Sequence, residues 1–366
     1  MGTKHVLISG YYGMGNAGDE LILASILTDM RTCIPGASIM VLSGSPAQTA
    51  RDFAVHAVNR KNPWGVLTAL IKADLVMTGG GGIFQDTTSS LSLYYYAAII
   101  FCAYLLRKTN CVYAVEISNL KHRFNRMIVK NICRLARYMS VRNLESSAHL
   151  KEWGYAGNPL ILPDPVLGLC GLQKHVQQEA EAVHVGFVIR QVHRRSKIFR
   201  QTYLQRLGKI IQYCIDCRIL PVLVPFHKKQ DIAICVQLEK IVNKKLLILC
   251  FNSVAELLNV FAEFSLVISS RLHALILAHA YHIPSIGFIP ADNDDGGKIK
   301  NFLEFSENKN YFLEESLDPD AVIARIDSVL HKTPAENILV STAYLNSLFK
   351  TKEIFWKQIT AFDPHK

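Results

Sequence analysis

Short apolar runs typical of strands alternate with longer runs typical of helices along almost the whole chain. The predicted strands cover residues 5–9, 38–43, 74–78, 111–117, 138–141, 183–189, 220–224, 246–250, 266–269 and 285–288. The predicted helices cover residues 20–32, 63–73, 91–108, 123–135, 144–153, 203–216, 231–242, 254–262, 273–281, 320–330 and 344–360. Repeated strand–helix order favours mostly parallel sheets that are covered on both faces. The sequence thus predicts an α/β fold of two doubly wound, Rossmann-like domains that face a cleft.

The alternation pauses once, and this pause predicts the boundary between the two domains. It stops near residues 161–165, and a polar stretch at 173–181 precedes the next strand. A length of 366 residues suits two domains, and a hydrophobic content of 50% excludes disorder as the main state. We expect an N-terminal Rossmann-like domain at residues 1–172, a C-terminal one at 173–343 and a C-terminal helix at 344–366.

The charge balance indicates a substrate or partner that carries negative charge. Lys and Arg number 40 against 30 Asp and Glu, which gives a net charge of +10. The basic residues form separate clusters at 193–195, 228–229 and 244–245. Such scatter suits an anionic substrate, a membrane surface or nucleic acid, and charge alone does not choose among them. We expect no nucleic-acid partner, because no motif of interleaved aromatic and basic residues is present.

Cysteine usage and the N-terminal sequence favour a cytoplasmic location. The nine cysteines are an odd number spread through apolar segments, which is typical of reduced thiols. The chain begins with a strand pattern, so no signal peptide is expected. The apolar run at residues 91–106 falls short of the about 20 residues that span a bilayer. We interpret it as a buried helix, with shallow contact to the inner face of the membrane as the alternative.

A glycine-rich segment at residues 10–20 follows the first predicted strand and opens a helix. Residues 13–18 match G-x-G-x-x-G, but a dinucleotide site needs an acid at the end of the second strand, and residues 41–45 contain none. One interpretation is a flexible turn in which Asp19 caps the helix. The other is a substrate loop whose glycines permit close backbone approach. Its binding residues would be Gly13, Gly15, Asn16, Asp19 and Glu20.

Four successive glycines at positions 79–82 follow the third predicted strand. Such a run costs conformational entropy and offers the core no side chain, so a purely structural connection rarely needs it. Gln85 and Asp86 come next, and an amide beside a carboxylate suits sugar hydroxyls or a proton acceptor. The alternatives are a tight turn with a helix-capping Asp86, and a site in which Gly80, Gly81 and Gln85 bind substrate and Asp86 is catalytic.

Ser270, Arg271 and His273 lie between a predicted strand and the following helix. A helix start offers free N–H groups and partial positive charge, and an Arg can hold a carboxylate or phosphate with two hydrogen bonds. We expect an anion site here, in which His273 is either a proton donor or a buried structural residue. Three further cationic side chains follow strands or loops of the same predicted domain: Arg190, His227 and Lys298.

Six segments together resemble the polysaccharide pyruvyl transferase family, and they occur in the family's order. The segments are residues 10–20 (GYYGMGNAGDE), 79–86 (GGGGIFQD), 141–142 (VR), 164–165 (DP), 225–227 (PFH) and 271–275 (RLHAL). The resemblance implies a glycosyltransferase-B-like fold. It also implies transfer of a pyruvyl group from phosphoenolpyruvate to a sugar of a cell-surface glycan or its precursor, as a cyclic ketal, with release of phosphate.

The residue types suggest a hypothesis for the role of each residue in such a transfer. The C-terminal domain is the phosphoenolpyruvate side, with Arg271, Arg190 and Lys298 as cations and His273 as general acid. The N-terminal domain is the acceptor side, where Asp86, Asp19 or Glu20 orients sugar hydroxyls or takes a proton. No metal or redox cofactor is required, since phosphoenolpyruvate is a co-substrate. Whether the sugar acceptor is lipid-linked stays open.

Two segments depart from the family pattern. Members usually carry a Gln-Gly-Ile-Gly-Pro-like segment where this chain has residues 115–120 (VEISNL), with a negative charge and no glycine or proline. The family's Asp-Pro-Lys segment is here residues 296–298 (GGK), with Phe302 at the expected offset. The alternatives to a pyruvyl transferase are a nucleotide-sugar-dependent glycosyltransferase of the same fold and a non-catalytic sugar- or anion-binding relative.

Overall fold

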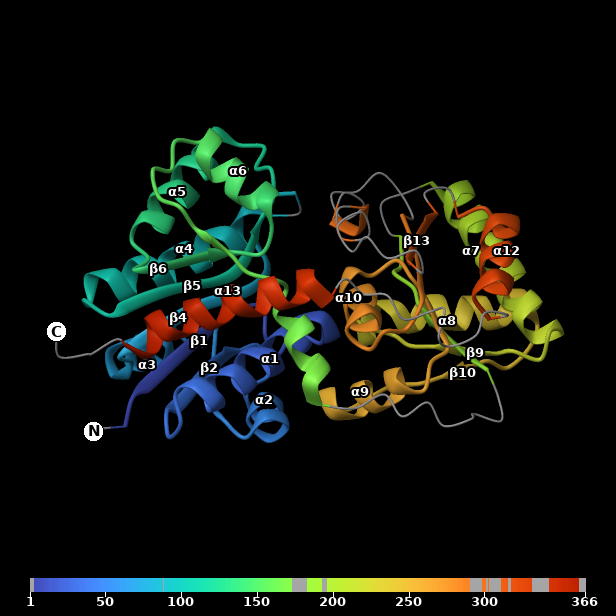
Figure 1. The fold of residues 1–366 in the computed structure, drawn as a ribbon, viewed down its shortest axis with the longest axis horizontal. Coiled ribbons are helices and arrows are strands. Elements are labelled where there is room, and N and C mark those ends of the chain that lie inside the picture. The colour runs from blue at the N-terminus through green and yellow to red at the C-terminus, as the bar shows by residue number, and fades with distance from the viewer. Residues whose placement is uncertain are drawn as a thin grey trace. The chain divides into compact units, whose positions relative to one another are not determined.

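The computed structural model describes residues 3–87, 89–172, 183–192, 196–289, 298–300, 302, 311–314, 317–330 and 342–361. The chain divides into two compact units (Figure 1). Unit 1 comprises Met1–Gly168 and Asn346–Lys366, and unit 2 comprises Leu169–Leu345. Each unit contains a parallel sheet covered by helices, so the predicted fold of two doubly wound α/β domains is confirmed. The polar stretch at 173–181, where the boundary was expected, lies outside the described residues.

Unit 1 is built on a sheet that has seven parallel strands in the described part of the chain. The strands are β1 His5–Ser9, β2 Ser38–Ser43, β3 His56–Asn59, β4 Leu75–Phe84, β5 Thr109–Ile117, β6 Tyr138–Val141 and β7 Leu160–Ile161. Their order is β3-β2-β1-β4-β5-β6-β7. The chain therefore starts in the middle, builds outward to β3 and then crosses back to β4. The direction of winding switches between β1 and β4, and such switch points are where doubly wound sheets bind ligands.

Helices cover both faces of the unit 1 sheet. They are α1 Ala17–Cys33, α2 Pro46–Phe53, α3 Pro63–Lys72, α4 Ser90–Leu105, α5 Arg123–Arg134 and α6 Leu144–Glu152, with the 3-10 turn η1 Pro165–Leu172 after them. The C-terminal helix α13, Thr342–Thr360, returns to this sheet (Figure 1). It packs Phe355 and Trp356 against Tyr113 of β5, with ring centroids 5.4 and 5.5 Å apart. Lys352 of α13 also pairs with Asp29 of α1 at 2.7 Å.

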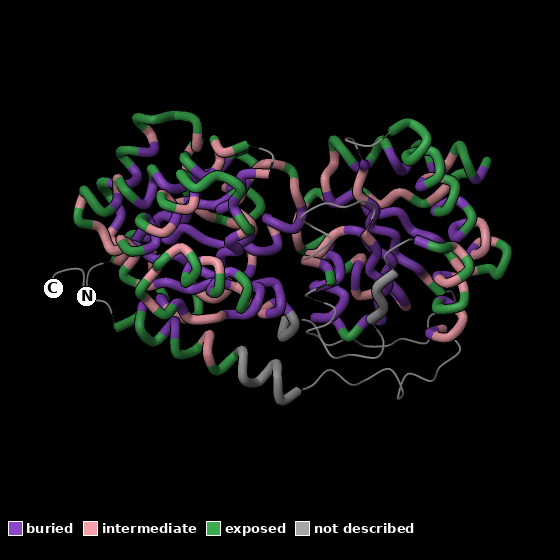
Figure 2. The backbone as a smooth tube through the Cα atoms, turned by 90° about the horizontal axis from the view of Figure 1, so that it is seen from above, coloured by how far each residue is buried: buried purple, intermediate pink, exposed green. Residues whose placement is uncertain are grey.

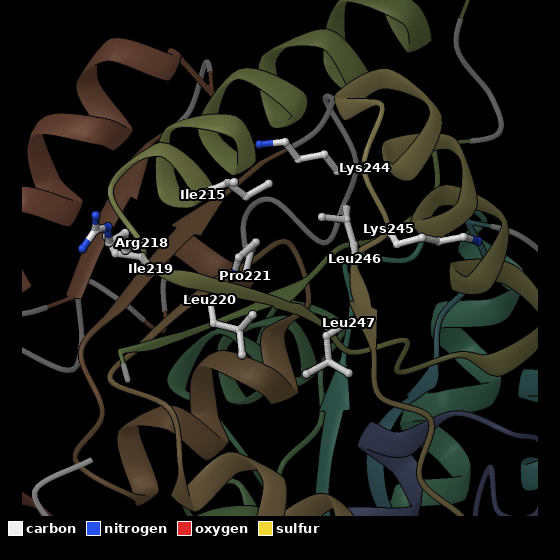
Figure 3. Close-up of a pocket in the computed structure, with 9 residues that line it drawn as sticks. All are labelled: Ile215, Arg218, Ile219, Leu220, Pro221, Lys244, Lys245, Leu246 and Leu247. Atoms are coloured by element: carbon white, nitrogen blue, oxygen red, sulfur yellow. The ribbon is translucent and has the colours of Figure 1, made fainter. Parts of the chain in front are cut away.

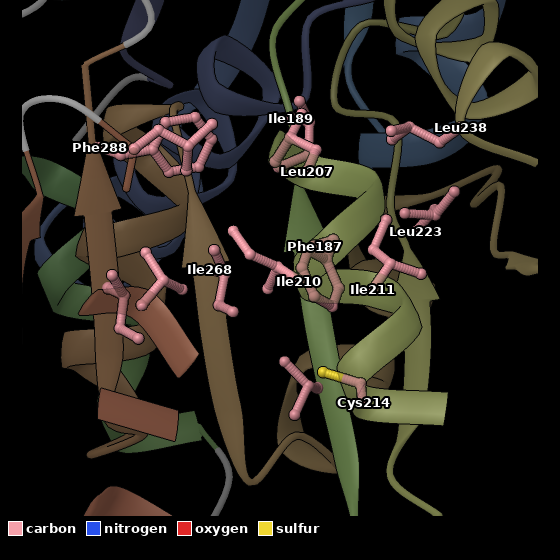
Figure 4. Close-up of a cluster of buried hydrophobic side chains, with 14 of the residues drawn as sticks. Phe187, Ile189, Leu207, Ile210, Ile211, Cys214, Leu223, Leu238, Ile268 and Phe288 are labelled. Carbon is pink, nitrogen blue, oxygen red and sulfur yellow. The ribbon is translucent and has the colours of Figure 1, made fainter. Parts of the chain in front are cut away.

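Unit 2 repeats the design with six parallel strands among its described residues, in the order β10-β9-β8-β11-β12-β13. The strands are β8 His184–Val188, β9 Leu220–Leu223, β10 Leu247–Ile248, β11 Leu266–Ser269, β12 Ser285–Phe288 and β13 Tyr311–Glu314. The helices are α7 Lys197–Asp216, α8 Lys228–Val242, α9 Val254–Ala262, α10 Leu272–Ala280 and α12 Pro319–Leu330. Phe187 of β8 and Ile210 and Ile211 of α7 belong to its main core cluster (Figure 4). Here the winding direction switches between β8 and β11.

Buried strands and half-buried helices recur in both units, as Figure 2 shows. The strand prediction was wrong at β3, β7 and β13, which it missed, and so was the helix prediction at α2. The three missed strands are short, with four residues in β3 and β13 and two in β7, whereas α2 has eight residues but buries only Thr49. A run of two to four residues is too short to display a hydrophobic period.

The end of the third predicted strand at residue 78 was also wrong. Strand β4 continues through all four glycines to Phe84, and its pairing with β5 becomes irregular between Gly81 and Phe84. Gly80 and Gly81 have φ angles of 73° and 75°, a backbone region that L side chains rarely adopt. A Cβ on Gly80 would lie 2.0 Å from Cγ2 of Ile22 in α1. The glycines therefore let α1 pack directly on β4 at the switch point.

No helix within the described residues is both long and apolar enough to cross a membrane. The expected apolar helix is present as α4, which has 16 residues. Leu93, Tyr96 and Ile100 on one side of it are buried, whereas Leu91 and Phe101 are exposed. The interpretation of this segment as a buried helix therefore holds for one side of α4 only.

Replacement of Gly80 by Ala should lower the stability of unit 1 more than the same change at Gly36. Both positions have positive φ, but a Cβ at Gly36 meets nothing within 4 Å. Gly36→Ala should cost about 1–2 kcal/mol from the backbone conformation alone. Gly80→Ala should cost about 1–3 kcal/mol more, because α1 must move away from β4. Urea unfolding followed by circular dichroism measures both, and equal losses would contradict the close-packing explanation.

Candidate active site

The loop after β1 is held against its own sheet by a buried tyrosine. The Tyr12 hydroxyl donates to the carbonyl of Gly79 at 2.6 Å, and the Gly44 N–H donates to the carbonyl of Tyr12 at 2.9 Å. Gly13 has a φ of 68°, and a Cβ there would lie 2.0 Å from Oγ of Ser43. The glycine loop therefore lies at the carboxyl ends of β1, β2 and β4, which is the switch point of unit 1.

Asn16, and not Asp19, caps helix α1. The Asn16 side chain accepts from the N–H of Gly18, and its amide donates to the Asp19 carboxylate. The cap assigned to Asp19 was wrong because α1 begins at Ala17, three residues earlier than predicted. Asp19 lies instead in the first turn of the helix, and its carboxylate is 3.1 Å from the Cβ position of Gly81. This contact places the two glycine-rich segments side by side.

Glu20 folds back onto the glycine loop. Its Oε1 accepts from the N–H of Gly13 at 2.7 Å. Burial raises the pKa of Glu20 to about 7; the Gly13 hydrogen bond opposes this rise, and the nearby Asp19 carboxylate adds to it. Glu20 can therefore gain or lose a proton near neutral pH, as a residue that exchanges protons with substrate hydroxyls would need to.

Asp86 lies just after β4, and both oxygens of its carboxylate accept hydrogen bonds. It accepts from the N–H groups of Lys121 and His122 at 3.0 and 3.1 Å, and from the side chain of Asn125 at 2.9 Å. Although desolvation opposes them, these hydrogen bonds hold the pKa of Asp86 below its usual value. The adjacent Gln85 is half-buried and accepts from the Thr87 hydroxyl at 3.2 Å. The geometry favours a role for Asp86 in positioning the start of α5.

Arg60 belongs to this edge of unit 1, although the sequence reasoning missed it. It follows β3, and it donates to the Gly10 carbonyl and the Tyr96 hydroxyl, both at 3.3 Å. Its guanidinium carbon lies 4.4 Å from the ring centroid of Tyr95, a cation–π distance. A cation directly after a strand is the signal that could have found it, but β3 itself was not predicted.

Three buried charges lie near the ends of β5, β6 and β7. Arg142 pairs with Glu116 and, at 2.7 Å, with Asp164, and all three side chains are at most 8% exposed. Glu116 is the charged residue in the segment that departs from the family pattern. Arg142 and Asp164 are two of the residues that carry the resemblance. The negative charge at position 116 is therefore paired with a cation within unit 1, which it shares with Asp164.

In unit 2, the carboxyl ends of β9, β8 and β11 bring together His227, Arg190 and Arg271. The Arg190 N–H donates to the Ser270 hydroxyl at 2.8 Å, which joins the ends of β8 and β11. Burial, and then the charge of Arg271, lower the pKa of Arg190. The same two causes lower the pKa of His227. These shifts show two cations and an imidazole close enough to interact at the switch point of unit 2.

Asp231 in the first turn of α8 holds this group in place. It is fully buried, accepts from the His227 N–H at 2.8 Å, and pairs with the Arg271 guanidinium at 2.5 Å. The Nε of Arg271 has no hydrogen-bond partner among the described residues. One end of the Arg271 fork is therefore fixed by Asp231, while its Nε–H retains the capacity to donate. Sequence reasoning missed Asp231 because an acid in a first helical turn usually serves only the helix dipole.

His273 is half-buried in the first turn of α10, and Lys298 is also half-buried. Ile299, next to Lys298, packs on Leu275 of α10, and Leu272 borders the same cluster. The lysine segment therefore lies beside α10. The preceding residues 294–297 and the basic cluster at 193–195 lie outside the described residues.

A surface pocket of unit 2 lies elsewhere. It is lined by side chains that include Arg218 and Lys245, which precede β9 and β10, and Pro221 near the start of β9 (Figure 3). This is the amino-end edge of the sheet, opposite to the edge that carries Arg190 and Arg271. No group of three or more metal-ligating side chains occurs among the residues that the structure describes.

Comparison with known proteins gives a family and a fold. The sequence matches the family model described as polysaccharide pyruvyl transferase over residues 16–293. No curated protein matches the chain. A putative UDP-N-acetylglucosamine 2-epimerase from Listeria monocytogenes is similar in structure, with a TM-score of 0.63, 12% identity and coverage of 92% of this chain and 90% of that one.

Two further solved structures resemble the chain. The UDP-GlcNAc 2-epimerase from Methanocaldococcus jannaschii, in complex with UDP-GlcNAc and UDP, has a TM-score of 0.57 and 13% identity, covering 90% of this chain and 94% of that one. A glycosyltransferase from Rickettsia africae has a TM-score of 0.54 and 15% identity, covering 99% and 100%. At these identities the likeness shows the fold alone, which is of the glycosyltransferase-B type.

Glu20→Gln should remove part of the pH dependence of stability. The folded pKa of about 7 exceeds the unfolded value of 4.5, so the folded state binds the proton more tightly. The contribution of Glu20 is therefore present below pH 4.5 and is lost as the pH rises to about 7, a change on the order of 3 kcal/mol. Thermal unfolding between pH 5 and pH 8 should show a flatter profile for Glu20→Gln than for the wild type. Exposed Glu152→Gln is the control, and parallel profiles for wild type and Glu20→Gln would contradict the assignment.

Arg142→Met should destabilise unit 1 by about 3–5 kcal/mol, because two buried carboxylates lose their common partner. Adding Glu116→Gln and Asp164→Asn to this variant should restore part of the loss, because no buried charge then remains in the cluster. Urea unfolding of the single and triple variants measures the difference. A triple variant that is less stable than Arg142→Met alone would count against charge neutralisation as the purpose of the cluster.

Proposed function

Because the chain belongs to the polysaccharide pyruvyl transferase family, we propose that it moves a pyruvyl group from phosphoenolpyruvate to a sugar of a cell-surface glycan or its precursor. The product is a cyclic ketal, and phosphate is released. The observation that carries the proposal is the proximity of Arg190 and Arg271 at the β8–β11 switch point, where the Arg190 N–H bonds to Ser270, the residue before Arg271, beside the start of α10.

Phosphoenolpyruvate carries a carboxylate and a phosphate, and therefore needs more than one cation. Arg190 and Arg271 interact electrostatically, which lowers the pKa of Arg190 after the larger effect of burial. An anion between two such cations relieves their repulsion, so the site favours a multiply charged anion over a neutral ligand. The Nε–H of Arg271 and the N–H groups at the start of α10 are suitable donors for its oxygens. Lys298, beside α10, is the third proposed cation, with Ser270 and His227 completing the site.

The proposed reaction begins with protonation of the methylene carbon of phosphoenolpyruvate by His273. The electrons of the carbon–carbon double bond of phosphoenolpyruvate form the new C–H bond, and the central carbon becomes electrophilic. One sugar hydroxyl attacks this carbon, the C–O bond to phosphate breaks, and a second hydroxyl closes the ketal ring. One of the two hydroxyl protons returns His273 to its protonated state, and the other leaves with the phosphate. No redox change occurs, and phosphoenolpyruvate is the co-substrate.

Unit 1 supplies the proposed acceptor site at its own switch point. Gly13 and Gly15 permit close backbone approach, and Asn16, Gln85 and the backbone at Gly80 and Gly81 offer hydrogen bonds to sugar hydroxyls. Glu20, with a pKa of about 7, is the best placed of the carboxylates to take a hydroxyl proton. Asp86, whose carboxylate accepts three hydrogen bonds, and Asp19, which accepts from the Asn16 amide, then hold the surrounding loops in position.

His273→Ala should lower phosphate release by about 10²–10⁴-fold, the usual contribution of a general acid. The assay incubates the protein with phosphoenolpyruvate and a panel of sugar acceptors. Phosphoenolpyruvate should still raise the melting temperature of the variant, because the arginines remain. The exposed His56→Ala is the matched control and should keep full activity. Normal turnover in His273→Ala would show that His273 is not the general acid.

The donor itself is tested by thermal shift with phosphoenolpyruvate and with UDP-GlcNAc, the ligand of one solved relative. Stabilisation by phosphoenolpyruvate that is lost in Arg190→Gln supports the proposal. Stabilisation by UDP-GlcNAc alone would favour a nucleotide-sugar-dependent glycosyltransferase instead. Binding of phosphoenolpyruvate without phosphate release on any acceptor would favour a non-catalytic relative.

A further inference from the structure

Three neighbouring helices of unit 1 expose an unusual number of large apolar side chains. They lie on α3, α4 and α5 and are Trp64, Leu67, Ile71, Leu91, Tyr94, Phe101, Tyr104, Leu105, Phe124 and Met127. We call this surface the α3–α5 face. Trp64 is 77% exposed, Leu91 76% and Phe124 60%, values that a side chain with a packing role would not show. Exposed apolar surface of this extent marks an interaction site.

The three helices lie side by side on one face of the sheet. Val66 of α3 and Ile99 of α4 belong to one buried cluster, and Ile100 of α4 and Val129 of α5 belong to another. The Lys108 ammonium donates to the Ile71 carbonyl at 2.6 Å and joins the ends of α3 and α4. The Tyr94 hydroxyl likewise donates to Asn125 at 2.9 Å and joins α4 to α5. The exposed side chains therefore form one surface, and are not scattered single residues.

The charged side chains of these three helices and their flanks are all basic. Residues 60–73, 90–108 and 121–137, which contain the three helices and their flanks, include eleven Lys and Arg residues and no Asp or Glu. Lys61, Lys72, Arg107, Lys121 and Arg123 are exposed. Apolar side chains interleaved with unopposed positive charge are complementary to a bilayer of anionic lipids. A second protein surface would need its own matching excess of acidic residues.

Three of the four most exposed apolar side chains of the α3–α5 face lie at one edge of unit 1. Trp64, Leu91 and Phe124 each lie at the second residue of their helix. In a parallel sheet, the helices begin at the edge where the strands end. These three side chains are thus at the same edge as the glycine loop after β1. A membrane bound there would lie beside the switch point of unit 1.

We infer that the α3–α5 face binds the surface of a membrane that contains anionic lipids. The apolar side chains insert at the level of the headgroups, and the lysines and arginines pair with lipid phosphates. Contact is peripheral, because α4 has only 16 residues and its inner side is buried in the core of unit 1. This inference does not depend on the donor, since the surface would bind the bilayer whatever reaction the protein performs.

Co-sedimentation of the full chain with vesicles tests the inference. Vesicles of phosphatidylcholine and phosphatidylglycerol should bind the protein at low salt, and vesicles of phosphatidylcholine alone should bind it at least about tenfold more weakly. Lys61→Glu with Lys121→Glu should weaken binding by about tenfold or more, and so should Leu91→Gln with Phe101→Gln. Ile198→Gln in α7, at a residue 76% exposed, and exposed Lys240→Glu in α8 are the matched controls in unit 2.

Trp64 provides an independent readout of insertion. It is the exposed one of the three tryptophans, since Trp153 is half-buried and Trp356 is buried. Its emission should shift to the blue on binding, be quenched by brominated lipids, and lose both responses in Trp64→Phe. Absence of binding to anionic vesicles at low salt would overturn the inference, and so would equal binding to neutral vesicles. A dimer that is lost in Leu91→Gln with Phe101→Gln, with no vesicle binding, would assign the face to a second copy of the chain.

Discussion

The arrangement of unit 2 depends on one buried ion pair, between Asp231 and Arg271. A carboxylate with no exposed surface is costly unless a cation and hydrogen bonds compensate it, and Arg271 and the His227 N–H supply both. Strands β9 and β11 are not neighbours, because β8 lies between them. The pair therefore bridges across the end of β8, where Arg190 lies. Electrostatics at this edge thus fix the positions of three strand ends at once.

Unit 1 reaches a similar result by close packing at its switch point. There the close approach is steric: Gly80 and Gly81 leave room for Ile22 and Asp19 of α1, and Tyr12 fastens the neighbouring loop to the Gly79 carbonyl. The two units accordingly present different chemistry at equivalent positions. Unit 2 offers positive charge, which suits an anionic donor, and unit 1 offers backbone and carboxylate oxygens, which suit hydroxyl groups.

Much of this could be predicted because a parallel sheet gives strong local signals. Strands such as β1 and β11 are continuous buried apolar runs, helices such as α1 and α7 are longer segments between strands, and the loops after the strands contain the notable residues. The side chains that these residues contact could not be predicted in the same way. Asp231 lies 40 residues from Arg271, and Asp86 is tied to residues more than 30 positions further on. Such contacts follow from the strand order, which propensity and spacing do not specify. The extension of β4 through four glycines was hidden for a related reason, since glycine has no strand preference and its use depends on what packs above it.

Residues 115–120, which depart from the family pattern, show how contacts between residues distant in the sequence compensate a local change. In the sequence, Glu116 places a negative charge on a strand that is buried, which taken alone would be strongly unfavourable. In the structure the adjacent strand β6 ends beside it, and Arg142 follows that strand. Arg142 has a second carboxylate partner, Asp164, so one buried guanidinium is shared by two buried carboxylates. Glu116 pairs with Arg142, one of the residues on which the resemblance rests. The charge that this departure introduces is therefore compensated inside unit 1, and the charged residues at the ends of β8, β9 and β11 are unchanged.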